Sequence, residues 1–375
     1  MQFSTISEEA SQILAENRRV LSGQQFTVPG GKYSSQLFLE SCLASIILRR
    51  FDTKSAEKEI TALLSTQLPD GKIAKEPRKI PLTAPPLIAY SALEVFQTSR
   101  NKEFLEKVFP RLDKFYKWLS VVRDPYSQNL ISIIHPDESG YMESMAWETY
   151  KKSLDNLDLS YKNIDFNDTL FLQRGYFDVK DIFFNCVYLE SLKSMAEISK
   201  ILERKDIFFY AKKYEDTHNA ITKHLYEKEK NLFFSLDRSG NKIEILTPVI
   251  FMPLFSKLLS FSQAKSLVNA YLHNHQQFWT DYPVPTLSFS EKGFDSVKYW
   301  KGSSTVRMNW FIFKGLMNYG LIETAEDLYE KTLDMISKSG FFEHYNSITG
   351  EGLGQSRYTS SCLVLDMEKE LSLRY

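Results

Sequence analysis

Two consecutive stretches near the start of the chain decide its fold. Residues 36–51 read QLFLESCLASIILRRF, and residues 55–67 read SAEKEITALLSTQ. The first stretch is apolar around nearly the whole circumference of a helix, which predicts a helix in the interior. The second alternates charged and apolar residues at helical spacing, which predicts a surface helix that ends at the turn signal PDG of residues 69–71. An inner helix is therefore followed directly by an outer one.

The same alternation continues along the chain. Residues 304–318 are again apolar nearly all round, and residues 322–338 again alternate charges. Helical periodicity predicts further helices at residues 5–17, 85–98, 102–119, 179–202, 207–226, 262–272 and 357–371. About six inner and about six outer helices are the pattern of an all-α, (α/α)6 toroid. The fixed-length repeat of an α-solenoid is not visible, and no linker divides residues 1–375, so a single domain is expected.

The composition excludes several classes of protein. Hydrophobic residues make up 43% of the 375 residues and charged residues 25%, which excludes wholesale disorder. A net charge of −1 argues against a nucleic-acid partner, because such a surface needs clustered cations. The longest apolar runs, residues 42–48 and 249–255, are far shorter than the roughly 20 residues of a membrane span. A small molecule is the expected partner.

The cysteines and the first residues indicate the compartment. Cys42, Cys186 and Cys362 lie far apart in apolar stretches, which predicts reduced core thiols and a cytoplasmic protein. Residues 1–12 are acidic and lack the apolar core of a secretory signal. No group of residues has the spacing of a metal site, so neither a metal nor another cofactor is expected.

Three stretches interrupt the helical pattern and are candidates for the walls of a site. They are residues 124–178, which are polar and aromatic, residues 278–301, and residues 340–354, which contain four glycines. Long loops in a compact domain are usually functional, and on one rim of a toroid these three would build a pocket. Aromatic residues make up 14% of the chain, which fits a large core, an aromatic-lined cavity, or both.

Short motifs, in order along the chain, carry a resemblance to a known family. They are TAPPL at 83–87, RD at 123–124, HPDESG at 135–140, YWKG at 299–302 with NW at 309–310, and GFFEHYNSITGEGLG at 340–354. Together they resemble the helical-toroid glycoside hydrolases, which include trehalase, glucosidase I and bacterial mannosylglycerate hydrolase. The resemblance covers nearly the whole chain. It implies the toroid fold and an inverting enzyme that acts on an α-linked glycoside or a small glycosylated metabolite.

The resemblance also implies a pair of catalytic carboxyl groups. Inverting glycosidases use one carboxyl as general acid and another as the general base that activates water. The family's base falls on Glu343. The family's acid segment, ESGMDNSPRWD, places Met142 at the acid position when it is aligned without a gap, whereas a shift of one residue places Glu143 there. Both registers stay open, and Glu143 is the candidate acid.

The substrate-binding candidates that the resemblance implies are Gln36, Glu40, Trp147, Tyr299, Trp300, Lys301, His344 and Tyr345. Several positions depart from the family. The segment QWxWDS of the trehalase-like relatives is QLFLES at 36–41, the glutamine of TQPP is Ala84, and the arginine of YWRG is Lys301, which lacks the planar fork of a guanidinium. These changes predict a pocket that is more apolar than an ordinary sugar site.

Two alternatives follow from this apolar lining. The first is an enzyme of the same fold repurposed for acid-initiated rearrangement or cyclisation of an apolar, terpenoid-like substrate, whose cationic intermediate aromatic rings would stabilise. It requires Leu37, Leu39, Ala84 and Met142 to face the cavity. The second is a non-catalytic homologue, in which the carboxyl groups would not converge on one point.

Overall fold

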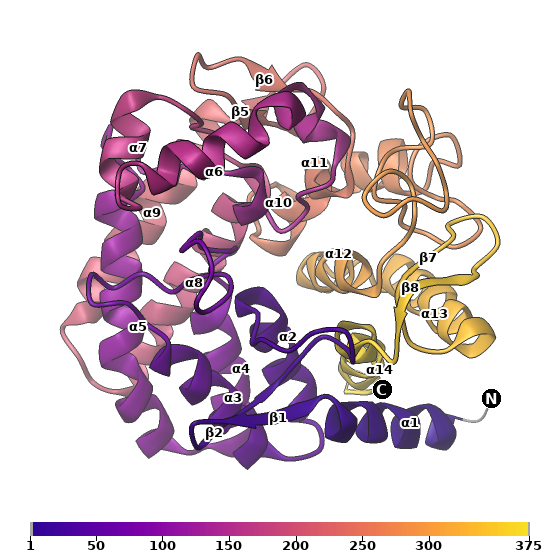
Figure 1. Cartoon of the computed structure of the whole chain (residues 1–375). Helices are drawn as coiled ribbons and strands as arrows, with labels where there is room; N and C mark the ends of the chain where they lie inside the picture. Colours follow the sequence, from indigo (N-terminus) through magenta and orange to yellow (C-terminus); the bar gives the residue numbers. More distant parts are fainter. Residues whose placement is uncertain (1–2, 374–375) are drawn as a thin grey trace.

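The computed structural model describes residues 3–373 and has the form of a closed ring of helices (Figure 1). Six helices form the inner ring: α2 (Phe38–Leu48), α4 (Ile88–Ser99), α8 (Ile182–Ile201), α10 (Met252–Phe255), α12 (Val306–Asn318) and α14 (Val364–Ser372). Each contacts the next, and α14 contacts α2, so the ring closes. This arrangement confirms the predicted inner helices at 36–51 and 304–318.

A second set of helices lies outside the ring. These are α1 (Phe3–Glu16), α3 (Thr53–Ser65), α5 (Lys102–Val122), α9 (Asp206–His224), α11 (Phe261–Leu267), which continues into the π-helical turn Val268–Leu272, and α13 (Ile322–Ser339). The helices α3, α5, α9 and α13 pack on the inner helices that precede them. Every residue of α2 is buried, whereas α3 and α13 keep a charged face. The structure is therefore the predicted (α/α)6 toroid.

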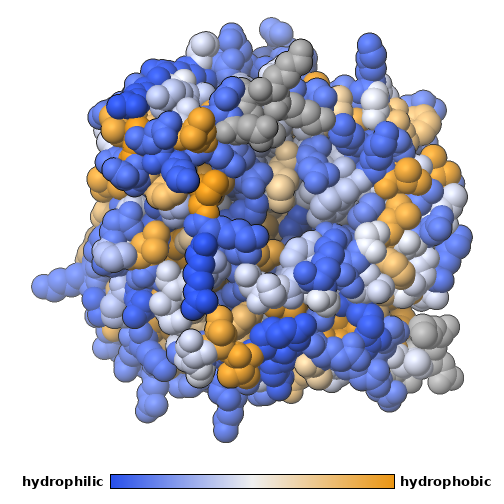
Figure 2. All heavy atoms as spheres, in the orientation of Figure 1, coloured by the Kyte–Doolittle hydropathy of each residue, from blue (hydrophilic) through white to orange (hydrophobic). Residues whose placement is uncertain are grey.

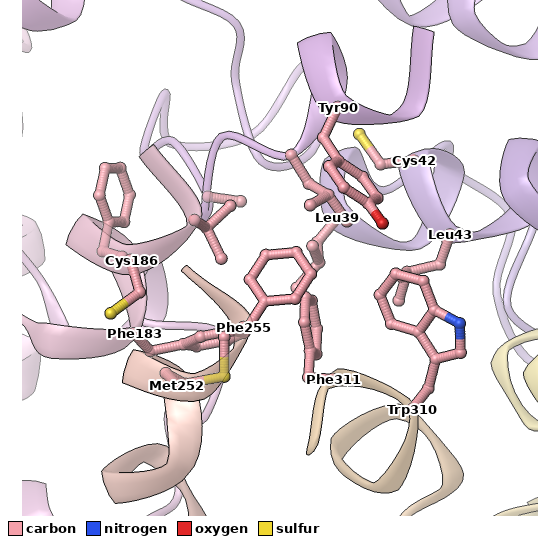
Figure 3. Packing of buried hydrophobic residues seen from close by; sticks show 14 of the residues in the cluster. Leu39, Cys42, Leu43, Tyr90, Phe183, Cys186, Met252, Phe255, Trp310 and Phe311 are labelled. Atoms are coloured by element: carbon pink, nitrogen blue, oxygen red, sulfur yellow. The ribbon is translucent and has the colours of Figure 1, made fainter. Parts of the chain in front are cut away.

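The core is built where the inner helices meet, and it is rich in aromatic rings (Figure 3). Phe311 of α12 packs edge-on against Phe255 of α10 and Phe183 of α8, with ring centroids 5.2 Å apart in both pairs. At Gly315, an added Cβ would lie 2.6 Å from the Cβ of Leu254. Glycine is therefore needed inside α12, because any larger residue would push α10 away.

Some elements differ from the sequence-based expectations. The inner helix α10 and the 3₁₀ turn before it (Pro248–Phe251) were expected only as an apolar run, because the prolines at 248 and 253 and the short length hide the helical period. Residues 124–178 are not irregular throughout. They contain 3₁₀ turns at Pro136–Glu138 and Met145–Ser153 and the helices α6 (Leu154–Lys162) and α7 (Asp168–Arg174).

Residues 340–354 also differ, because most of them form a hairpin rather than an irregular loop. Strand β7 (Phe342–Tyr345) pairs antiparallel with β8 (Gly352–Ser356), and a 3₁₀ turn at Thr359–Leu363 then leads into α14. Three more two-stranded antiparallel sheets are formed by β1 (Arg18–Leu21) with β2 (Gln24–Thr27), β3 (Tyr226–Glu227) with β4 (Leu232–Phe233), and β5 (Ser235–Leu236) with β6 (Lys242–Ile243).

Two further sequence-based expectations concern thiols and membranes. Cys42, Cys186 and Cys362 are buried and unpaired, as predicted. Within residues 3–373, every helix is too short or too polar to cross a bilayer. Figure 2 shows the ring face of Figure 1 with its side chains, mostly hydrophilic and hollowed near its centre.

Candidate active site

A cavity of about 130 Å³ lies where the start of α2 meets the three interrupting stretches. Met142, Trp300 and Glu343 line it, and each comes from a different one of these stretches. This confirms the expectation that the three stretches wall one pocket. Leu37, the first three residues of α2 and Arg307 of α12 also line it.

Glu343 lies on β7 with both carboxylate oxygens engaged. Lys32 Nζ lies 2.7 Å from Oε2, the Tyr33 hydroxyl donates to Oε1 at 2.9 Å, and the backbone N–H of Gln355 donates to Oε2 at 3.1 Å. Burial alone would raise the pKa of Glu343, but these donors hold it below its ordinary value. The carboxylate is therefore ionised and able to accept a proton.

The backbone beside Glu343 is adapted to this contact. Gly354 has a φ of +73°, and an added Cβ would lie 2.9 Å from Glu343 Oε2. A larger residue would be strained there and would also displace the carboxylate. Glycine at 354 therefore lets β8 lie close to the Glu343 carboxylate on β7.

Glu40 lies in the first turn of α2 and is fixed by an arginine from the opposite end of the sequence. Arg307 Nη1 donates to Glu40 Oε1 at 2.7 Å, and the Ser360 hydroxyl donates to Oε2. Arg307 Nη2 also donates to the carbonyl of Gly140 at 3.0 Å, and its guanidinium lies 5.3 Å from the Trp300 ring centroid. Arg307 therefore links three parts of the cavity lining: Glu40 of α2, the backbone at Gly140, and Trp300.

A second cation lies at the wall formed by residues 135–142. Lys75 Nζ is 3.1 Å from Asp137 Oδ2 and 3.9 Å from the sulfur of Met142, and all three residues line the cavity. Glu143 is exposed and does not line the cavity. The structure thus brings Met142 to the wall, as in the ungapped register. The role of Glu143 as acid stays a prediction.

The neighbouring residues explain why Met142 lines the cavity and Glu143 does not. Tyr141 is buried and donates its hydroxyl to Asp181, and its ring lies 5.3 Å from that of Trp147 and 6.0 Å from that of Trp300. Gly140 before it has a φ of +83°, which turns the chain. Because the Tyr141 side chain is held in the interior, the Met142 side chain lies at the cavity and the Glu143 side chain is exposed to solvent.

The motif HPDESG is held by a buried ion pair. Arg123 donates to both oxygens of Glu138 at 2.6 Å and to Asp168 at 2.8 Å. Glu138 also accepts the backbone N–H groups of Thr83 and Ile134 at 2.8 and 2.9 Å. Burial alone would raise the pKa of Glu138, but Arg123 holds it below its ordinary value. The glutamate of the motif therefore has a structural role, since it joins the backbone at Thr83 and Ile134 to the Arg123 side chain.

Four of the predicted site residues line the cavity: Glu40, Tyr299, Trp300 and Glu343. The ring of Tyr299 also lies 4.8 Å from that of His344, which is buried behind it and is not part of the lining. Tyr345 is likewise buried behind the lining, where its hydroxyl donates to the carbonyl of Gly340 at 2.8 Å. His344 and Tyr345 thus lie in the predicted stretch 340–354, but their side chains do not line the cavity.

The other three predicted binding residues have different surroundings. Trp147 is buried behind Tyr141, and Lys301 Nζ lies 3.8 Å from a carboxylate oxygen of Glu148. Gln36 lies in a separate groove and donates to the buried carboxyl of Glu59 at 3.4 Å. Like Glu143, they do not line the cavity.

Sequence reasoning did not single out five of the polar residues that line the cavity: Tyr33, Lys75, Asp137, Arg307 and Tyr358. For Arg307 a signal existed, because a cation in the first turn of an otherwise apolar inner helix needs a buried partner. For the others no periodic pattern marks the residue. Among the described side chains, no cluster of three His, Cys, Asp or Glu residues is placed to hold a metal ion.

Comparisons with known proteins agree with this geometry. The mannosylglycerate hydrolase of Rubrobacter radiotolerans is 25% identical, over 92% of this chain and 93% of the relative. That of Thermus thermophilus is 23% identical, over 94% and 98%. The crystal structure of a GH63 mannosylglycerate hydrolase from Thermus thermophilus in complex with glucose matches with a TM-score of 0.90 and 23% identity, over 97% of this chain and 100% of that one.

A more distant structure has the same fold. Neutral trehalase from Saccharomyces cerevisiae matches with a TM-score of 0.69 and 16% identity, over 96% of this chain and 79% of the trehalase. The model of the mannosylglycerate hydrolase MGH1-like glycoside hydrolase domain matches residues 33–361. These findings confirm the predicted resemblance, the toroid and a glycosidase-like enzyme. The chain belongs to the family of mannosylglycerate hydrolase MGH1-like glycoside hydrolases.

Proposed function

We propose that this enzyme hydrolyses an α-linked glycoside of a small metabolite with inversion of the anomeric carbon, using Glu343 as general base. The observation that carries the proposal is the ionised Glu343 carboxylate at the cavity wall, held by Lys32 and Tyr33. The relatives support the substrate class, since they include mannosylglycerate hydrolases and a glucosylglycerate hydrolase of Mycolicibacterium hassiacum.

In the reaction, Glu343 takes a proton from a water molecule as the water oxygen bonds to the anomeric carbon. The bond from that carbon to the leaving oxygen breaks, and its electron pair stays on the leaving oxygen, which takes a proton from the general acid, for which Glu143 is the candidate from the sequence. Positive charge builds up on the sugar ring in the transition state. The Trp300 ring offers a flat surface, and the Glu40 carboxylate, which Arg307 and Ser360 hold in place, offers an acceptor for sugar hydroxyls.

The alternative of a cationic rearrangement is not favoured. Leu37, Leu39, Ala84 and Met142 do line the cavity, as that alternative requires. However, five charged side chains line it as well: Glu40, Lys75, Asp137, Arg307 and Glu343. An apolar substrate would remove water from these charges without replacing its hydrogen bonds, which is costly. The family assignment favours hydrolysis of a polar substrate.

The decisive variant is Glu343→Gln. We expect kcat on α-glucosides and α-mannosides to fall by at least about 10²–10⁴-fold, because the amide cannot take the proton from water. Turnover is measured as sugar release, and proton NMR of the first-formed anomer checks the inversion. Glu351→Gln, in the exposed loop of the same hairpin, is the matched control.

Azide provides a second readout. It is a small anion that can enter the space left by the carboxylate in Glu343→Ala and attack the anomeric carbon, so it should restore turnover of an activated substrate by that variant. Absence of α-glycoside turnover by the unaltered enzyme, or full activity of Glu343→Gln, would contradict the proposal.

We also propose that the enzyme works in the cytoplasm. Its three cysteines are buried and unpaired, which fits a reducing compartment.

A further inference from the structure

The carboxyl groups that line the cavity all have a cation beside them. Glu40 lies 2.7 Å from Arg307, Asp137 lies 3.1 Å from Lys75, and Glu343 lies 2.7 Å from Lys32. A general acid must carry its proton at the working pH, and proteins achieve this by placing a carboxyl in apolar surroundings, away from cations. Among the residues that line the cavity, none of the carboxyl groups has such surroundings.

The other groups at the wall are poor proton donors. Met142 has a thioether, which carries no proton. Burial raises the pKa of Tyr33, Tyr299 and Tyr358 above the ordinary value of tyrosine, so their hydroxyls hold their protons more tightly. The cavity therefore combines an ionised base with a wall that does not offer an acidic proton to the leaving oxygen.

The Lys75 ammonium lies on this wall, and the backbone of Lys75 is held in place by hydrogen bonds. The backbone N–H of Lys75 donates to the carbonyl of Leu82 at 2.6 Å, and the carbonyl of Lys75 accepts the N–H of Phe38 at the start of α2 at 2.9 Å. Its ammonium has three N–H donors, of which one contacts Asp137 at 3.1 Å and one the sulfur of Met142 at 3.9 Å. A preorganised cation lowers the energy of a leaving group that departs with negative charge, without giving it a proton.

We propose, on the basis of the proposed glycosidase function, that the substrate is a glycosyl phosphate and that Lys75 stabilises the departing phosphate. The phosphate ester reacts in its singly protonated form. The water oxygen bonds to the anomeric carbon, Glu343 takes one proton from that water, and the electron pair of the broken carbon–oxygen bond stays on the phosphate. The products are the inverted free sugar, hydrogen phosphate with two negative charges, and protonated Glu343, which then releases its proton to solvent.

This chemistry needs no acid in the cavity, because the departing oxygen of a phosphate is a much weaker base than the alkoxide of an ordinary glycoside. Asp137 has a defined part in it. Its carboxylate faces the same ammonium that the phosphate would contact, so the two anions compete for Lys75. Asp137→Asn should therefore lower KM for the glycosyl phosphate.

The test compares two leaving groups on the same sugars. The substrates are the 1-phosphates of α-glucose and α-mannose and the corresponding 4-nitrophenyl α-glycosides, each followed by release of the free sugar. For Lys75→Met we expect kcat/KM to fall by about 10²-fold or more on the phosphates and by less than about tenfold on the aryl glycosides. Lys75→Arg keeps the charge and should keep most of the activity, and the exposed Lys79→Met is the matched control.

The outcomes separate this inference from the function on which it rests. Turnover of aryl glycosides without turnover of the phosphates would overturn the phosphate substrate and leave the glycosidase. Turnover of neither substrate class by the unaltered enzyme would overturn both. Equal losses of kcat/KM on the two substrate classes in Lys75→Met would also overturn the inference. So would loss of phosphate turnover in Asp137→Asn or in Glu143→Gln, because a carboxyl group would then act as the acid.

Discussion

Among the groups that lower the pKa of Glu343, the Lys32 ammonium has the largest effect. Burial pushes the pKa of Glu343 upward, and the hydrogen bond from Lys32 is the strongest influence in the opposite direction. Lys32 is itself half-exposed, so its removal leaves the packing of the hairpin intact. A change at this residue should therefore act on the proton affinity of the base and not on the fold.

For Lys32→Met we expect the acid limb of the kcat/KM profile to move to higher pH. The pKa of Glu343 rises when the ammonium is removed, so the base becomes protonated and inactive at a higher pH than in the unaltered enzyme. The measurement is the pH profile with a 4-nitrophenyl α-glycoside, whose own ionisation is constant. Lys58→Met, an exposed lysine on α3, is the control, and an unshifted acid limb in Lys32→Met would contradict the assignment of Glu343 as base.

The helix α3 carries a buried carboxyl group on the side that faces α2. Glu59 is 1% exposed and accepts a hydrogen bond from Gln36, the residue that precedes Leu37 at the start of α2. Burial raises the pKa of Glu59 to about 7, and hydrogen bonds from residues that include Gln36 and Thr27 lower this pKa only in part. Gln36 is thus a partner of this carboxyl and lies outside the cavity, and its predicted contact with substrate stays a prediction.

Glu59→Gln should stabilise the protein at neutral and higher pH. The folded-state pKa of Glu59 is raised, so its contribution to stability is fully present below about pH 4.5 and is lost as the pH rises through about 7. Glutamine keeps an acceptor for Gln36 and never ionises, so the gain should reach about 3 kcal/mol at pH 8 and vanish near pH 4.5. Urea unfolding at both pH values measures the difference, and a gain that does not depend on pH would refute the explanation.

The closure of the ring depends on a buried ionic cluster between three inner helices. Asp366 of α14 is 2.8 Å from Arg49 and 2.5 Å from Arg50, which follow α2, and it accepts the indole N–H of Trp310 of α12 at 2.8 Å. Burial alone would raise the pKa of Asp366, but Arg49, Lys314 and Arg50 lower it to about 2. The first and last inner helices are therefore joined by charge as well as by apolar packing.

Asp366→Asn should destabilise the whole ring. At pH 7 we expect a loss of about 3–5 kcal/mol in the free energy of unfolding, because the variant removes the buried carboxylate that Arg49 and Arg50 share and leaves Arg49 with Glu94 alone. The folded-state pKa of Asp366 is depressed, so its contribution is present above about pH 4 and is lost as the pH falls through about 2. The difference in free energy of unfolding between the unaltered protein and Asp366→Asn should therefore be about 2 kcal/mol smaller at pH 2 than at pH 7. Unfolding curves at pH 7 and pH 2 test this, with Asp334→Asn on the outer helix α13 as control.

The sequence by itself determined the helices, their inner or outer position and the family. These features can be predicted because the spacing of apolar residues along a helix shows which side of the helix faces the core, and this spacing depends on neighbouring residues alone. The apolar period did not reveal α10, which has four residues, nor the short helices α6 and α7. The sequence pointed to Glu343 and Glu40, which line the cavity, because they lie within recognisable segments.

Only the tertiary structure decided what each loop side chain contacts. Met142 lines the cavity and Glu143 does not, because the preceding Tyr141 is anchored to Asp181, 40 positions away in sequence. The pairing of Glu40 with Arg307 joins residues 267 positions apart. In a loop no repeating geometry links one side chain's direction to the next, so the direction is set by long-range contacts that exist only once the ring has closed.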